Sequence, residues 1–383
     1  MLVSTATAHA LPMFFTPELS AWADRLEGML SGSLTDLDEP KTVARALGQR
    51  GLLSALFPEA FGGAAVGLRD RVSVRALCLT REALGYFSPL ADSVFAVQGL
   101  GTYARVLTGA LDAGGIKPFI SGEQIAGFAL TEPEAGSDVA SMRSHAQADG
   151  IRFRLTGEKC FISNVGIAHS YVVFANANPG LGKKGISAFV MHANAVGLEE
   201  RAIATGGDHP LGALTFNEAD ATLLGEVGQG LRLALGTLDV FRTSVGAAAV
   251  GMAQRAFDEA VQFVTSREQF GKKLVEFQLT QAALAEMATD LEAARLLVYR
   301  AAWMKDMGLP AATEVAMAKM FATEAAQRVI DRAVQLLGGR GVTGDHIVSR
   351  LYREVRPLRI YEGTTEIQKL IIGSAYVKRR GES

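Results

Sequence analysis

The stretch Tyr171-Val172-Val173-Phe174-Ala175 decides the fold class of this 383-residue chain. Its β-branched and aromatic residues indicate a buried strand, and a similar run at 186–191 indicates a second one. Residues 151–155 alternate apolar and basic side chains, which is typical of a half-buried strand. Turn sequences separate these runs. The part of the chain from about 125 to 230 is therefore expected to form a small β domain.

Helical periodicity occupies both sides of this β region. Leu19 and Trp22 begin a three- and four-residue repeat, and long helical patterns run through 229–267, 276–307 and 311–337. Three long helices with a shorter terminal one are typical of a four-helix bundle. We therefore predict a mainly α chain with a central β domain. The predicted domains are a helical domain at 1–122, a β domain at 123–228 and a helical bundle at 229–383.

Composition excludes several classes of function. The net charge of -2 comes without a basic block, which argues against a nucleic-acid partner. Two cysteines, Cys78 and Cys160, make no disulfide framework, and six scattered histidines lack the spacing of metal ligands. No run approaches the ~18 apolar residues of a membrane helix, and no positive segment precedes Ala8-His9-Ala10. We expect a cytoplasmic protein with no membrane partner and no metal.

The sequence Tyr361-Glu362-Gly363-Thr364-Thr365 contains the candidate catalytic carboxylate. Glu362 follows a basic, apolar run at 353–360, and an apolar setting raises the proton affinity of a carboxylate, which suits a general base. Gly363 allows another group to approach the backbone, and Thr364 fits the N-cap of a final helix. An ordinary helix start explains the same residues, so the pattern alone leaves both interpretations open.

Four other motifs are candidate binding sites. Residues 128–138 could offer amides and hydroxyls to a phosphate, and residues 159–164 could pack a flat ring. In residues 266–271, Arg267 could grip a phosphate. A solvated turn, a β edge and a helix C-terminus are the structural alternatives. Residues 339–344 match G-x-G-x-x-G but follow a helix instead of a strand, so we predict a glycine-rich helix end and no Rossmann site.

In this order and at these separations, the motifs resemble those of the flavin-dependent acyl-CoA dehydrogenase family. The resemblance extends from about residue 16 to 380. It implies an N-terminal helical domain, a middle β-barrel and a C-terminal four-helix bundle. The motifs are FALTEPEAGSD (128–138), KCFISN (159–164), SREQFGKKLVEFQ (266–278), QLLGGRG (335–341) and YEGTTEIQ (361–368).

The resemblance implies FAD as the cofactor and assigns residues to it. Ser163 replaces the family's usual threonine and keeps its hydroxyl, and the 266–278 motif implies contacts with FAD from the neighbouring subunit. The residues implied for the cofactor are Phe128, Leu130, Thr131, Gly136, Ser137, Phe161, Ile162, Ser163, Arg267, Gln269, Phe270, Gln278, Gln335, Leu336, Gly338, Gly339, Thr364, Thr365 and Glu366. Those implied for the substrate are Ser137, Asp239, Phe241, Arg242, Tyr361 and Gly363.

The resemblance also implies that Glu362 is the catalytic base. Some members carry the base one helix away, immediately before the arginine matched by Arg242, but here that residue is Phe241, which cannot accept a proton. Glu362 would take the α-proton of an acyl-CoA while the β-hydride passes to flavin N5, giving a trans-2-enoyl thioester. The Glu362 amide and a ribityl hydroxyl would hold the thioester oxygen, typically worth ~3–4 kcal/mol per donor.

The implied partners are an acyl-CoA substrate from fatty or carboxylic acid catabolism and an electron-transfer flavoprotein as acceptor. A cofactor site shared between subunits implies a homo-oligomer, at least a dimer and by resemblance a tetramer. An acyl-carrier-protein dehydrogenase, an oxygen-using oxidase and a non-catalytic flavin-binding scaffold are the alternatives. A nitroalkane oxidase is disfavoured because that branch is expected to carry aspartate at the position of Glu362. The shape of the acyl chain stays open.

Overall fold

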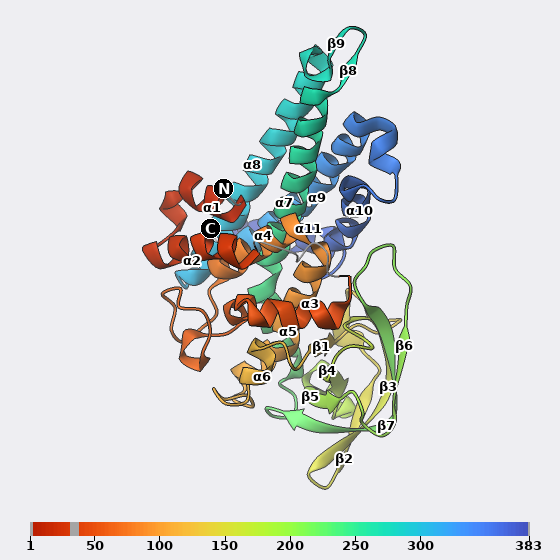
Figure 1. Ribbon diagram of the computed structural model, residues 1–383. Coiled ribbons are helices and arrows are strands. Elements are labelled where there is room, and N and C mark those ends of the chain that lie inside the picture. Colours follow the sequence, from red (N-terminus) through yellow and green to blue (C-terminus); the bar gives the residue numbers. More distant parts are fainter. Residues whose placement is uncertain (1–2, 31–37, 382–383) are drawn as a thin grey trace. The chain divides into compact units, whose positions relative to one another are not determined.

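The computed structural model describes residues 3–30 and 38–381 (Figure 1). The chain forms two compact units. Unit 1 contains the described residues 3–30, 73–92 and 242–381, and unit 2 contains 38–72 and 93–241. Helices α5 (Pro89–Leu107) and α7 (Gly230–Ser266) each contribute residues to both units.

Unit 2 is built on a closed β-sheet. The sheet order is β1-β4-β2-β3-β7-β5, β6 pairs with β7, and a further pairing of β5 with β4 closes the sheet into a barrel. This confirms the predicted central β domain. The strands are β1 (Ala126–Ala129), β2 (His145–Asp149), β3 (Arg152–Ser163), β4 (Ser170–Asn176), β5 (Ile186–His192), β6 (Leu198–Ala202) and β7 (Leu211–Leu224).

Strand β4 explains why residues 171–175 are apolar without interruption. Tyr171 and Val173 belong to one buried cluster, whereas Val172 and Phe174 belong to a second cluster that also contains residues of α5 and α7. A strand that is buried on both faces reads as a continuous apolar run. The predicted alternation at 151–155 was wrong at its first residue, because Ile151 lies in the turn before β3 and is 93% exposed.

Short helices complete unit 2 around the barrel. They are α3 (Pro40–Gln49) and α6 (Lys117–Ile120), with the 3-10 helices η2 (Leu52–Leu56), η3 (Glu59–Phe61), η4 (Val139–Ser141) and η5 (Pro179–Gly185).

Unit 1 is helical, and its three long helices confirm the predicted patterns at 229–267, 276–307 and 311–337. The β8–β9 hairpin lies at one end of α7 and α8 (Figure 1). Besides α7, the unit contains α1 (Val3–Ala10), α2 (Pro17–Leu30), α4 (Val74–Phe87), α8 (Gln278–Asp306), α9 (Ala312–Leu337), α10 (Ile347–Glu354) and α11 (Thr365–Gly381), with β8 (Glu268–Gln269) and β9 (Lys272–Lys273). Its 3-10 helices are η1 (Pro12–Phe14), η6 (Leu274–Glu276), η7 (Gly338–Val342) and η8 (Arg356–Arg359).

Two glycines allow α4 and α7 to pack closely. A Cβ at Gly85 would lie 2.4 Å from the Ala248 carbonyl oxygen, and one at Gly251 would lie 2.0 Å from the Glu82 carbonyl oxygen. The side chain of Glu82 is fully buried and accepts hydrogen bonds from Arg295 Nε at 2.9 Å and Tyr299 Oη at 2.5 Å. The interior of unit 1 is therefore fixed by backbone contact and by a buried charge pair, which makes it a rigid support for residues on α7, α9 and α11.

Helix α7 has the length and average composition of a membrane span. Its most apolar window has a mean hydropathy of 1.3, and 67% of that window is buried within the protein. Core helices of folded domains share these properties.

Candidate active site

The turn that precedes α11 carries Glu362, and its backbone is unusual. Glu362 has φ +54° and Gly363 has φ +95°, so two consecutive residues adopt left-handed conformations. Glutamate seldom takes this conformation, and such strain tends to occur at functional sites. A Cβ at Gly363 would lie 2.6 Å from Gln368 Nε2. The positive φ favours glycine at 363, and a larger residue would also displace the Gln368 amide that binds the carbonyl oxygen of this residue.

Side chains from three helices hold this turn. Arg242 Nε, on α7, donates to the Glu362 carbonyl oxygen at 2.9 Å. Lys319 Nζ, on α9, donates to the Gly363 carbonyl oxygen at 2.8 Å, and Gln368 Nε2, on α11, donates to the same oxygen at 2.9 Å. The strained backbone of the turn is thus stabilised by two donors that are far away in sequence, Arg242 and Lys319, and by one nearby donor, Gln368.

The Glu362 side chain sits in a poorly solvated and positively charged environment. The residue as a whole is half-buried, but its Oε2 atom is sheltered from solvent and has no hydrogen-bond partner among the described residues. Burial raises the pKa of Glu362, while Arg81, Arg242 and Lys319 act against this rise and Asp92 adds to it. The direction agrees with the raised proton affinity that the apolar sequence context predicted.

Arg81 and Asp92 form a fully buried ion pair near this carboxylate. The two contacts, Nε to Oδ1 and Nη2 to Oδ2, are both 2.8 Å long. Arg81 Nη1 also donates to Ser244 Oγ at 3.1 Å, and Arg81 forms a further hydrogen bond with Tyr361. Arg81 thus connects α4, α5 and α7 to the residue directly before Glu362.

The residues after Glu362 and Gly363 begin α11. Thr364 Oγ1 accepts a hydrogen bond from the Ile367 amide at 3.3 Å, which confirms it as the predicted N-cap. Thr365 is buried and its hydroxyl donates to Glu324 Oε1 at 2.7 Å, whereas Glu366 is exposed. Of these three residues predicted to contact the cofactor, Thr364 and Thr365 therefore both have partners inside the protein.

In unit 2, the predicted substrate residues of α7 have different environments. Phe241 is fully buried, and its ring lies edge-on to Tyr103 with 5.8 Å between centroids. A Cβ at Gly99 would lie 2.3 Å from the same ring. Asp239 is half-buried, and its charge adds to the effect of burial in raising the pKa of Tyr103. Phe241 therefore serves as a core residue between α5 and α7.

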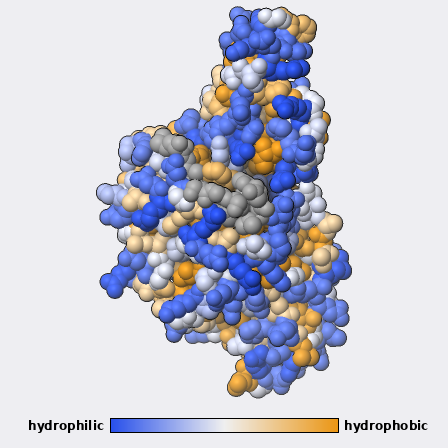
Figure 2. All heavy atoms as spheres, in the orientation of Figure 1, coloured by the Kyte–Doolittle hydropathy of each residue, from blue (hydrophilic) through white to orange (hydrophobic). Residues whose placement is uncertain are grey.

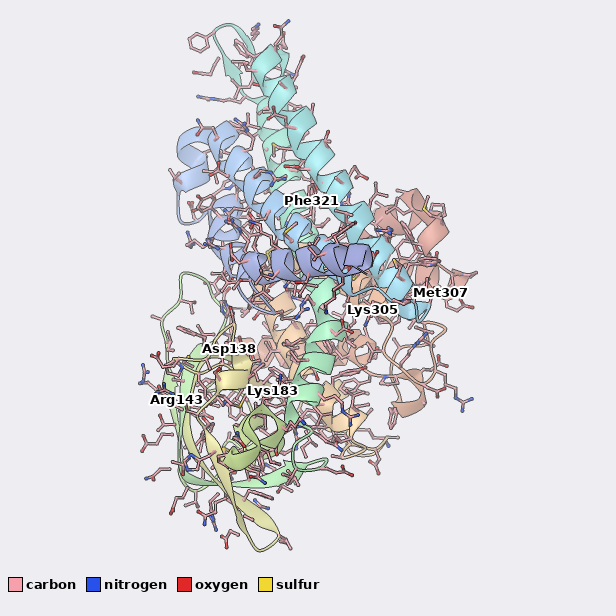
Figure 3. All side chains as sticks on the ribbon, turned by 180° about the vertical axis from the view of Figure 1, so that it is seen from behind. Asp138, Arg143, Lys183, Lys305, Met307 and Phe321 are labelled. Atoms are coloured by element: carbon pink, nitrogen blue, oxygen red, sulfur yellow. The ribbon has the colours of Figure 1, made fainter. Side chains whose placement is uncertain are left out.

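The loop after β1 carries the first set of predicted flavin residues, and a buried ion pair anchors it. Lys159 Nζ, fully buried on β3, contacts Glu132 Oε1 at 2.7 Å and the Leu130 carbonyl oxygen at 3.0 Å. Glu132 also accepts hydrogen bonds from the backbone amides of Arg143 and Ser144. Thr131 is half-buried between these anchors, and Gly136, Ser137 and Asp138 are exposed farther along the loop, which Asp138 and Arg143 mark in Figure 3.

The end of β3 carries the second set of residues that are predicted to contact the flavin. A register shift interrupts the pairing of β3 with β7 between Lys159 and Ile162, and Phe161 within it has φ +56° and is 65% exposed. Ile162 is buried and Ser163 is half-buried beside it. The Cys160 amide donates to the Thr131 carbonyl oxygen at 3.0 Å, so the loop and the strand end lie together. Phe128 is half-buried against Phe174, and Leu130 is buried.

These residues of unit 2 fit an isoalloxazine edge. Strain at Phe161 holds an aromatic ring out of the sheet, and exposed aromatic rings stack on flat heterocycles. The Ser163 and Thr131 hydroxyls can donate to ring heteroatoms. A Cβ at Gly136 would meet nothing within 4 Å, which leaves the backbone of the loop open to a ligand.

The third set of predicted cofactor residues lies on the β8–β9 hairpin and at the end of α9, in unit 1. Phe270 and Gly271 form the hairpin turn with φ +53° and +78°, and Phe270 is 94% exposed. Arg267, Gln269 and Gln278 are exposed nearby. At the end of α9, Gln335, Gly338 and Gly339 are exposed and Leu336 is half-buried. Residues 339–344 follow α9 as part of η7 and a turn, so the predicted glycine-rich helix end is confirmed.

Gln335 also lines a cleft of about 930 Å³ between α8 and α9. Ion pairs cross from one helix to the other, Arg328 to Asp290 at 2.8 Å and Arg332 to Glu286 at 3.5 Å. Arg328 also lies over the ring of Phe321, which Figure 3 labels on α9. The lining has charges of both signs, so it selects no single class of ligand.

The sequence did not indicate four residues that shape these sites: Arg81, Lys159, Lys319 and Gln368. Arg81, Lys159 and Lys319 act through partners 11, 27 and 44 residues away, whereas Gln368 is five residues from Gly363. A lysine or an arginine in a helix usually indicates a solvated face. No local pattern could therefore have identified Arg81 or Lys319, whereas Lys159 and Gln368 lie within the motifs at 159–164 and 361–368 but received no role there. In the described residues, no group of three His, Cys, Asp or Glu side chains could hold a metal ion.

Comparison with known proteins agrees with this arrangement. A family model described as "Acyl-CoA dehydrogenase, C-terminal domain" matches residues 228–377, and "Acyl-CoA dehydrogenase, middle domain" matches residues 127–219. The chain is 36% identical over 341 residues to the short-chain specific mitochondrial acyl-CoA dehydrogenase of Homo sapiens, with 87% of this chain and 82% of the relative covered. It is 38% identical over 275 residues to the caffeyl-CoA reductase-Etf complex subunit CarC of Acetobacterium woodii, with 69% and 71% covered.

A solved structure shares the fold. Butyryl-CoA dehydrogenase from Megasphaera elsdenii aligns with a TM-score of 0.87 and 30% identity, covering 95% of this chain and 99% of that one. The predicted acyl-CoA dehydrogenase-like fold, mainly α with a central β domain, is thereby confirmed. The sequence similarity, the family models and the shared fold agree, and the chain belongs to the acyl-CoA dehydrogenase family.

Proposed function

We propose that this protein catalyses the α,β-dehydrogenation of an acyl-CoA thioester to the trans-2-enoyl-CoA, with Glu362 as the base that abstracts the α-proton. The observation that carries the proposal is the Oε2 atom of the Glu362 carboxylate, which is sheltered and lacks a hydrogen-bond partner among the described residues, on a turn with a strained backbone. Structural carboxylates in protein interiors are normally paired. An unpaired one at the position of the family's base is available for proton transfer.

The environment of Glu362 suits both halves of its task. Arg81, Arg242 and Lys319 favour the ionised carboxylate that must be present before reaction. Burial favours the neutral acid that forms when the α-proton arrives. A base with its pKa raised toward the working pH is the more effective one. The Glu362 backbone amide is the proposed donor to the thioester oxygen, where negative charge develops.

FAD, when bound, supplies the acceptor for the β-hydride. Thr131, Ser137, Phe161 and Ser163 would hold it in unit 2. In unit 1, Arg267, Gln269 and the exposed end of α9 would contact FAD that belongs to a second subunit. These roles follow the family resemblance, and the anchored loop with the strained Phe161 supports them.

Anaerobic mixing of the purified flavoprotein with a panel of acyl-CoA esters tests the proposal. At least one ester should bleach the flavin absorbance of the wild-type protein. Glu362→Gln should retain bound flavin and reduce it at least about a hundredfold more slowly, because the general base is lost. Near-normal reduction by Glu362→Gln would remove this residue from the mechanism, and wild-type flavin that no thioester bleaches would contradict the activity.

We further propose an electron-transfer flavoprotein as the electron acceptor. The Acetobacterium relative is named as a subunit of an Etf complex, which supports this choice. That relative is also named as a reductase, and Glu362 could return the proton in the reverse direction. Two measurements separate this function from its alternatives. Faster flavin reduction by acyl-carrier-protein thioesters than by acyl-CoA would indicate a carrier-protein dehydrogenase. Peroxide formation during turnover in air would indicate an oxidase.

A further inference from the structure

Two successive carbonyl groups of the turn at 362–363 accept hydrogen bonds from side chains, and one of the donors is a buried ammonium. Lys319 is fully buried, and its Nζ atom lies 2.8 Å from the Gly363 carbonyl oxygen. Among the residues that the structure describes, Lys319 forms no ion pair. An ammonium group buried without a carboxylate partner is costly, so its retention calls for a reason.

An uncharged donor to the same oxygen is already present. Gln368 Nε2 donates to the Gly363 carbonyl oxygen at 2.9 Å. A second, charged hydrogen bond to one carbonyl adds strength, because bonds from an ionised donor are roughly twice as strong as neutral ones. This strength is applied to the carbonyl group of Gly363, the second of two successive residues with positive φ, the first of which is not glycine.

We propose that Lys319 is a positioning residue for the reaction, which with Gln368 holds the Gly363 carbonyl group and thereby fixes the left-handed turn that aims the Glu362 carboxylate. The inference rests on the proposed role of Glu362 as the base. Lys319 acts through the backbone of the turn.

The charge of Lys319 has a second effect on the same carboxylate. Burial lowers the pKa of Lys319 to about 8, and the charge of Glu362 partly restores it. The other charges that act on Lys319 are Arg242, Glu324 and Glu366. In return, the ammonium favours ionised Glu362. A neutral replacement therefore removes a backbone anchor and a favourable charge together, whereas arginine keeps both.

The test compares Lys319→Met, which keeps the length of the side chain but cannot donate, with Lys319→Arg in the full flavoprotein. Hydrogen–deuterium exchange of a peptide that spans residues 357–366 should be at least about tenfold faster in Lys319→Met. Flavin reduction at saturating acyl-CoA should be about 10- to 100-fold slower, with KM changed less than about threefold. Lys319→Arg should recover most of both losses.

Lys369→Met is the matched control, because Lys369 is exposed on α11 beside Gln368 and is not a donor to either carbonyl oxygen of the turn. It should exchange and react like the wild type. If Lys319→Met does not fold, Gln368→Met removes the other donor to the same oxygen and should accelerate exchange at 357–366 in the same way.

Two results would overturn the inference. One is unchanged exchange and an unchanged reduction rate in a folded Lys319→Met protein, even if its thermal stability has fallen. The other is equal loss in Lys319→Met and Lys369→Met. Failure of the proposed function is recognised separately, by near-normal flavin reduction in Glu362→Gln, and in that case the exchange at 357–366 still decides the role of Lys319.

Discussion

Glu362 is expected to destabilise the native protein at neutral pH. Burial raises its pKa in the folded state above the ordinary value of about 4.3. Below that ordinary value the side chain is protonated in both states, but above the raised value the folded protein carries a poorly solvated charge. Stability is therefore lost as the pH rises through this window. Glu362→Gln should raise Tm by roughly 1–3 °C at pH 7.

Measuring Glu362→Gln at acidic pH provides the control for this effect on Tm. The difference in Tm between wild type and Glu362→Gln should disappear below about pH 4, where both side chains are neutral. Thermal unfolding followed by circular dichroism at the two pH values measures this. An equal or lower Tm for Glu362→Gln at neutral pH would show that the cations around the carboxylate outweigh its burial.

A second prediction concerns Asp92 and the acidic side of the pH–rate profile of flavin reduction, called the acid limb here. Glu362 must be ionised to accept a proton, so the rate of flavin reduction should rise with pH through its apparent pKa. Asp92 adds to the rise of that pKa, whereas Arg81, Arg242 and Lys319 lower it. Asp92→Asn removes one negative charge and should shift the acid limb to lower pH by at least about 0.5 unit.

Stopped-flow reduction between pH 5 and about pH 9 measures the shift. Asp24→Asn is the matched control, because Asp24 is exposed on α2 and is not among the charges that act on Glu362. A shift to higher pH in Asp92→Asn would mean that Arg81 moves away when its partner is lost, and would contradict the prediction.

At this scale the sequence indicated the proposed base but not the side chains that support it. The apolar context, Gly363 and Thr364 lie within a few residues of each other, so they indicated Glu362 as a candidate base and Thr364 as the cap of α11. The donors to the turn come from α7, α9 and α11. Their convergence depends on how the helices pack, and a single sequence carries no local sign of that packing.

Among the elements, the loop after β1 depends on one buried ion pair. Lys159 joins this loop to β3 through Glu132 and the Leu130 carbonyl group, and burial lowers its pKa to about 8. Lys159→Met leaves Glu132 buried without its cation, which releases the loop that carries Thr131 and Ser137. We expect the Kd of FAD to rise at least about tenfold, measured by flavin fluorescence during titration of the apoprotein.

Lys183→Met serves as the control for this loss. Lys183 is exposed in η5, and Figure 3 labels it on unit 2. Its substitution should leave flavin affinity unchanged. Unaltered affinity in Lys159→Met would show that the loop does not need this anchor to hold the cofactor.

The contact between α4 and α7 allows a stability prediction. In Gly85→Ala the new Cβ would lie 2.4 Å from a backbone oxygen of Ala248, which can yield only if a helix moves. The expected loss is about 1–3 kcal/mol, as for overpacked cores. Gly373→Ala on α11 meets nothing within 4 Å and should gain up to about 1 kcal/mol from helix propensity. Urea unfolding of the two variants measures the contrast.

Sequence periodicity identified the elements with strong local signals and missed those without them. The long helices and strands β3, β4 and β5 were predicted because their apolar spacing extends over many residues. Strands β6 and β7 were not predicted, because exposed and charged residues interrupt them. The β8–β9 hairpin was missed because its turn uses Phe270 where asparagine or aspartate before glycine is usual. The domain boundaries at 122 and 228 stay predictions.

At the scale of the whole molecule, the exposed hairpin favours assembly. Figure 2 shows separate hydrophobic patches on a mostly hydrophilic surface in that view. Phe270 is 94% exposed in a strained conformation, and Leu279 close by in the chain is 86% exposed. An exposed aromatic ring in this conformation, with a second exposed apolar side chain near it in the sequence, is a candidate contact with another subunit, as the family resemblance implies. We expect a homo-oligomer whose mass is a multiple of 40.6 kDa in light scattering.

Phe270→Ser tests this expectation. If the hairpin contacts another subunit, the variant should lose flavin and shift toward smaller species on size-exclusion chromatography with light scattering. Ile151→Ser is the control, because Ile151 is 93% exposed in the turn before β3 and has no predicted interface role. A Phe270→Ser protein with unchanged mass and flavin content would exclude the hairpin from both roles.

The left-handed pair at 362–363 has one further consequence. A turn that local sequence disfavours keeps its shape only while α7, α9 and α11 stay in place around it. Heat, denaturant or a distant cavity that loosens those helices should therefore abolish turnover in the same transition that melts the bundle, instead of leaving an active fragment behind. We therefore expect activity and helical structure to be lost together.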